Sequence, residues 1–162
     1  METLPSIWRT EVLHALSVHL PLTSLILATL FFLTALVIKK SWISKASGAL
    51  LIIGTIGAWI SMLTGDAADG IVSRSLCDPT VLKAHENFAT ITTILFTVAS
   101  VIYILSSFID WSLRLKIVFK VIISLLLITG TAFLMYVGHL GASLVYQQGA
   151  GTYQPSEDCS EY

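Results

Sequence analysis

The chain has 162 residues, of which 55% are hydrophobic and only 12% are charged, and its mean hydropathy is +0.83. Because a soluble domain carries about 25% charged residues, this composition indicates an integral membrane protein. The formal net charge of −1 offers no basic surface for nucleic acid. The length suits a single membrane domain, residues 1–162.

The first long apolar run, residues 20–38, has no charged residue and is followed by Lys39. Nineteen helical residues span about 28 Å, close to the hydrocarbon thickness of a bilayer, about 30 Å. We therefore expect the first span at residues 14–39, with Pro21 kinking or loosening the helix because proline cannot donate the helical hydrogen bond. The residues before it are mixed and acidic rather than a basic signal-peptide start, so this span should stay in the mature protein.

Three further segments have the length and apolar character of transmembrane helices. We expect them at residues 46–65, 85–109 and 117–146, with a loop at 66–84 and a polar tail at 147–162. The sequence therefore predicts an all-α fold, an integral membrane four-helix bundle.

Basic residues are concentrated on one side of the four predicted spans. The turns after the first and third spans carry six, Lys39, Lys40, Lys45, Arg114, Lys116 and Lys120, against three on the other side, Arg9, Arg74 and Lys83. By the positive-inside rule, the N and C termini and the 66–84 loop are exoplasmic. In a bacterial inner membrane this side is periplasmic.

Both cysteines, Cys77 and Cys159, fall on the predicted exoplasmic side. A disulfide can persist in that compartment. The sequence does not show whether the two residues meet.

All four histidines fall toward the exoplasmic ends of the predicted helices. His19 and His139 lie twenty and nineteen residues from the basic ends of their spans, about 29 Å away. His14 and His85 each lie 25 residues from the corresponding boundary, about 37 Å away. Depth therefore sorts the histidines into two levels, His19 with His139 and His14 with His85.

Imidazoles from different helices at one depth suit bis-histidine ligation of haem b. His19 and His139 are the preferred axial pair, and His14 and His85 are a possible second pair, so we expect one or two haems. The flat macrocycle also needs helix surface without side chains, which glycines offer at Gly54, Gly57, Gly130, Gly138 and Gly141. Basic residues at the exoplasmic edge, Arg9, Arg74 and Lys83, are candidates to meet the haem propionates.

A non-haem site for copper, zinc or iron is the first alternative, with the four histidines joined by Asp66. The spacing argues against it, because His14 and His19 point about 140° apart on a helix and no HxxxH or CxxC pattern is present. The second alternative is an accessory structural subunit whose histidines make only hydrogen bonds. No nucleophile elbow or phosphate-binding loop is present, so a non-catalytic subunit is favoured over an enzyme.

Two motifs resemble those of the DUF2231 family of predicted bacterial membrane proteins. The segment HALSVHLP, His14–Pro21, resembles that family's HPxxVHFP-type opening, and GHLGASLVYQQGAG, Gly138–Gly151, is similar to its closing segment. The chain departs from the opening pattern at Ala15 and Leu20, where the family often has proline and phenylalanine. The resemblance implies a four-helix membrane bundle. It also implies a place in electron transfer, since some relatives are joined to cytochrome c or Rieske-type modules.

The functional prediction is a cytochrome b-like electron-transport subunit of the bacterial inner membrane with its histidine-rich face periplasmic. It would pass electrons between a quinol pool or a redox membrane complex and a periplasmic cytochrome or similar carrier. The sequence lacks CxxCH, which excludes covalently attached haem c.

Overall fold

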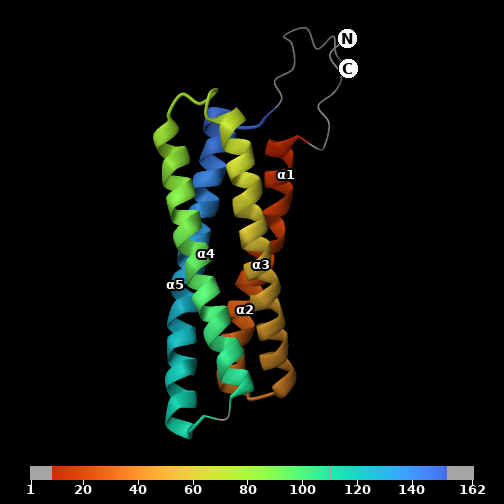
Figure 1. Ribbon diagram of the computed structural model, residues 1–162, viewed down its shortest axis with the longest axis vertical. Coiled ribbons are helices and arrows are strands. Elements are labelled where there is room, and N and C mark those ends of the chain that lie inside the picture. The colour runs from red at the N-terminus through yellow and green to blue at the C-terminus, as the bar shows by residue number, and fades with distance from the viewer. Residues whose placement is uncertain (1–8, 110, 153–162) are drawn as a thin grey trace.

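The computed structural model describes residues 9–109 and 111–152 and is helical throughout, with no strand in that part of the chain. Its five helices are α1 (Thr10–Ser17), α2 (His19–Ile38), α3 (Ser41–Val72), α4 (Pro79–Phe108) and α5 (Leu113–Gln148) (Figure 1). Since α1 and α2 together form one segment, Thr10–Ile38, four described segments are long and apolar enough to cross a membrane. The predicted all-α membrane bundle is confirmed.

The break between α1 and α2 falls at Val18, three residues before Pro21. Pro21 has no N–H to donate to the carbonyl of Ser17, so the helical ladder loses a bond here. The expected loosening is therefore present, and it separates His14 from His19.

The helices pack as two groups. α3 packs along α1 and α2, and α4 packs along α5, while contacts of α3 with α4 and of α2 with α5 join the groups (Figure 1). No Cα atom of α1 lies within 8 Å of α4 or α5. α1 therefore meets α4 through side chains, among them the rings of His14 and His85.

The bundle has an apolar outside and a partly polar inside. Large side chains such as Leu63, Leu125 and Ile56 are exposed, as expected for a surface that faces lipid. The buried core comes from all four spans and comprises Leu25, Ala28, Phe32, Leu51, Ala58, Phe96, Ala99, Ile123 and Leu127.

Hydroxyl groups join the helices beside this core. Thr29 and Thr131 are linked across α2 and α5 at 2.9 Å, and Thr55 and Ser100 across α3 and α4 at 2.8 Å. Ser47 on α3 donates to the carbonyl of Ala28 on α2. Interhelical hydrogen bonds of this kind are typical of membrane bundles.

The second and third spans are longer than predicted. α3 continues through residues 66–72, which were expected to lie in the loop, and α4 begins at Pro79 rather than at residue 85. Asp78 caps α4 by accepting from the hydroxyl and the amide of Thr80, at 2.6 and 2.9 Å, and these bonds hold the pKa of Asp78 below its usual range. The connection between α3 and α4 is therefore shorter than the predicted loop at 66–84 and loses residues at both of its ends.

These lengths set the depth of the histidine-rich end. α5 has 36 residues, which corresponds to about 54 Å, far more than the hydrocarbon core of about 30 Å. If Lys120 marks one boundary, the other falls near Leu140, and the rest of α5 stands beyond it. His14 and His85 lie at this polar end of the bundle.

Candidate functional site

His14 and His85 lie together inside the bundle. The first comes from α1 and the second from α4, and their ring centroids are 6.3 Å apart with the ring planes at 89°. Both side chains are partly buried. The structure therefore brings together the two histidines that the depth count placed at one level.

The His14 ring is anchored on α3. Its Nδ1 lies 3.1 Å from the carbonyl oxygen of Ser61 and 3.3 Å from the hydroxyl of Thr64. A carbonyl oxygen only accepts, so Nδ1 carries the proton and Nε2 keeps its lone pair. The Thr64 hydroxyl donates to the same carbonyl and lies 2.9 Å from the hydroxyl of Ser17.

The His85 ring is anchored in the same way on α5. Its Nδ1 donates to the carbonyl oxygen of Val137 over 3.1 Å. Within residues 9–152 as the structure describes them, Nε2 of neither His14 nor His85 has a hydrogen-bond partner. Histidines that bind metals characteristically donate their other ring N–H to a carbonyl or carboxylate.

Two glycines make room for the paired rings. A Cβ at Gly65 would lie 3.1 Å from Cε1 of His14, and a Cβ at Gly141 would lie 3.3 Å from Cε1 of His85. The other glycines considered for haem clearance serve helix packing or face open space. Gly54 abuts Leu25, Gly57 abuts Pro21, Gly130 abuts Phe96, and Gly138 has nothing within 4 Å.

His19 and His139 lie apart from the interior pair, His14 and His85. Both are exposed on the outside of the bundle and have no hydrogen bond within the described part of the chain. Val137 and Gly141 face His85, and His139 stands midway between them, about 200° around the helix from each. The structure therefore does not gather these two histidines with the interior pair.

The family model described as "Predicted membrane protein (DUF2231)" matches residues 10–154. The chain belongs to the DUF2231 family. No curated protein and no solved structure matches it. The site of this DUF2231 protein must therefore be interpreted from its own geometry.

Asp66, the carboxylate proposed for a non-haem site, is exposed on α3 of this DUF2231 protein. Among the described residues, no group of three or more histidines, cysteines and carboxylates is close enough to hold a metal ion. The interior pair therefore offers two protein nitrogens. Cys159 lies outside the described residues, so the structure does not test a disulfide between Cys159 and Cys77.

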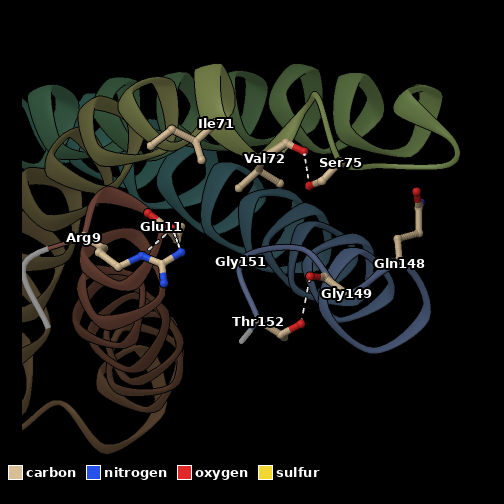
Figure 2. A pocket seen from close by; sticks show the side chains of 9 residues that line it. All are labelled: Arg9, Glu11, Ile71, Val72, Ser75, Gln148, Gly149, Gly151 and Thr152. Carbon is tan, nitrogen blue, oxygen red and sulfur yellow. Dashed lines mark hydrogen bonds and ion pairs between the residues drawn. The ribbon is translucent and has the colours of Figure 1, made fainter. Parts of the chain in front are cut away.

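A pocket of about 270 Å³, called the outer pocket below, opens at the end of the DUF2231 bundle that holds α1. It lies between the start of α1, the last turn of α3 and the turn that follows α5 (Figure 2). At its α1 edge, Arg9 forms an ion pair with the buried carboxylate of Glu11 (Figure 2). Glu11 lies about one helical turn before His14, so the pocket lies next to the His14 side of the pair.

Sequence reasoning did not find this pocket or the anchors of the rings. Ser61 and Val137 act through backbone carbonyls, which every residue possesses, so their identities carry no signal. Gln148 lines the pocket only because the bundle brings the end of α5 toward the end of α3. Arg9 was singled out from the sequence as a candidate to meet the haem propionates.

Proposed function

We propose that His14 and His85 are the axial ligands of one haem b, and that the protein is a membrane electron-transfer subunit. The observation that carries the proposal is the pair of rings 6.3 Å apart, each with Nδ1 held by a carbonyl and Nε2 open. Two imidazole nitrogens from rings at this spacing could hold one metal ion between them, with metal–nitrogen bonds of about 2 Å. The donor set and its spacing therefore fit the iron of a bis-histidine haem.

Haem is favoured over a bare transition-metal ion by the number of ligands. A structural zinc ion takes four protein ligands and a catalytic one takes three. Haem iron already has four porphyrin nitrogens and needs only two axial ligands. The described part of the chain offers two histidines and no third ligand. The spectrum proposed below distinguishes haem from the two alternatives, a non-haem metal site and an accessory structural subunit.

The chain's own residues hold and orient the ligands. The carbonyls of Ser61 and Val137 fix the Nδ1–H tautomer, and Thr64 supports the first of these contacts. Hydrogen bonding at Nδ1 raises the basicity of Nε2 and keeps each ring from turning. Haem b, when bound, supplies reversible one-electron chemistry.

The location of the site suits transfer across the outer boundary of the membrane. The opposite end of the bundle carries six of the nine basic residues, which supports an inner-membrane orientation with the histidine-rich end periplasmic. A quinol pool or membrane complex on one side and a periplasmic carrier on the other are the partners proposed for such a unit.

A reduced-minus-oxidised absorption spectrum of the purified protein tests the cofactor, with pyridine haemochrome quantification and elemental analysis. We expect a b-type spectrum and about one haem per chain. Bound metal without a Soret band would replace haem by a non-haem ion. Folded protein that holds neither haem nor metal, after expression with ample haem, would favour the accessory subunit.

The proposed orientation predicts that Cys77 is accessible from the periplasm, because it is exposed in the connection between α3 and α4. A Cys159→Ser variant leaves Cys77 as the sole cysteine. We expect a membrane-impermeant maleimide to label it in intact cells.

The matched control moves the sole cysteine to Ser112, in the exposed turn between α4 and α5. Ser112→Cys, in a chain without Cys77 and Cys159, should be labelled only after lysis. The reverse pattern would place the histidine-rich end in the cytoplasm and contradict the periplasmic partner.

A further inference from the structure

The outer pocket is rich in unused hydrogen-bond donors. Arg9 donates from Nε and Nη2 to one oxygen of Glu11, which uses two of the five N–H groups of a guanidinium. The side-chain oxygen of Gln148 accepts from the backbone amide of Asp78 over 2.9 Å. The NH₂ group of Gln148 is therefore the part of this side chain that can donate to a ligand. Within the described part of the chain, these remaining donors have no partner.

The hydroxyls at the rim are already committed as donors. Ser75 donates to the carbonyl of Val72, and Thr152 donates to the carbonyl of Gly149 (Figure 2). The unused donors of the pocket are therefore those of Arg9 and Gln148. Acceptor oxygens, and above all a carboxylate, match such a pocket, because guanidinium–carboxylate contacts are charge-assisted and among the stronger hydrogen bonds.

The position of the pocket indicates which carboxylate it receives. Arg9 precedes His14 by five residues, so it stands about 7 Å further out along the helix axis. Arg74 and Lys83, the other two outer cations considered, are exposed, and Lys83 is paired with Glu86 at 2.9 Å. Neither lines the pocket.

We propose that Arg9 binds a propionate carboxylate of the haem held by His14 and His85. The inference rests on the proposed function and adds the orientation of the cofactor, with its acidic edge toward water. Glu11 is then the fixed counter-charge that keeps Arg9 in the pocket.

The test compares two ligands that differ only at the carboxylates. Full-length haem-free protein is titrated with haem b and with haem b dimethyl ester, whose propionates are esterified, and binding is followed by absorbance. We expect the wild type to bind haem b about tenfold or more tightly than the ester, the effect of losing one charge-assisted hydrogen-bonded contact.

The variants separate a specific contact from a general charge effect. Arg9→Gln together with Glu11→Gln removes the guanidinium without leaving a buried carboxylate unpaired, and it should bind both ligands equally. Arg74→Gln removes a guanidinium from an exposed residue of the same end, outside the pocket, and it should keep the preference for haem b.

Each remaining result overturns the inference in a distinguishable way. Equal binding of the two ligands by the wild type, or a preference kept in the double variant, refutes the propionate contact and leaves the haem proposal intact. If neither ligand binds, both proposals fail together. If haem-free protein binds succinate in an Arg9-dependent manner while the wild type shows no preference for haem b, the pocket serves a free carboxylate instead.

Discussion

Replacing His14 or His85 with alanine should abolish the b-type absorbance of the purified protein. Each change removes one of the two axial nitrogens, and the described chain offers no other histidine near the pair. His14 and His85 are the partly buried histidines, and their rings lie 6.3 Å apart. Because the haem would lose one of the two side chains that hold it, we expect haem content to fall by tenfold or more, measured as pyridine haemochrome per chain.

His19→Ala and His139→Ala are matched controls, because both residues are exposed on the outside of the bundle. These variants should keep the wild-type spectrum and haem content. The opposite pattern, with haem lost in His19→Ala or His139→Ala and kept in the other two, would restore the pair preferred from sequence. It would place the cofactor on the outer surface of the bundle.

The depth of the histidines was predictable from sequence, but their facing was not. Counting residues from a charged boundary gives a height along the helix, and His14 and His85 do share one level. The direction of a side chain depends on how each helix is rotated in the bundle, and a count of residues along the helix does not give that rotation. For this reason the count could not choose between the interior pair and the exposed pair.

The extension of α3 shows a local signal overruled by packing. Residues 64–70, TGDAADG, have the composition of a turn, yet they remain helical to Val72. Ala68 is buried, and Gly65 fits against the His14 ring. Tertiary contacts on one face of the helix outweigh weak propensities, which differ by less than about 1 kcal/mol per residue.

The fold itself was predictable because it depends on sequence patterns that extend over many residues. Four apolar runs, their basic flanks and the proline at residue 21 fix the number of spans and the broken first helix. The outer pocket depends instead on the turn after α5 reaching Arg9 and Glu11. Contacts of this kind arise only when residues far apart in the sequence are packed together.

Gly54→Val should strongly destabilise the packing of α2 against α3. The Cβ of any side chain at residue 54 would lie 2.7 Å from Cγ and Cδ2 of Leu25 and 3.1 Å from Cβ of Ser24. Leu25 is fully buried and Ser24 nearly so, so neither can swing aside, and α2 must move away from α3. Overpacking of this kind costs about 1–3 kcal/mol, and a melt followed by circular dichroism in detergent should show a Tm lower by about 4–10 °C.

Gly70→Val on the same helix is the control, because a Cβ there meets nothing within 4 Å. Both changes add the same side chain to α3, so their effects on helix propensity are similar, and the difference in Tm reports the contact between α2 and α3. Wild-type melting of Gly54→Val would mean that Leu25 can be displaced without separating the helices.

The close approach of α2 and α3 matters for function too, because α3 carries the Ser61 carbonyl that holds His14. Gly54→Val should therefore also weaken haem binding, whereas Gly70→Val should not.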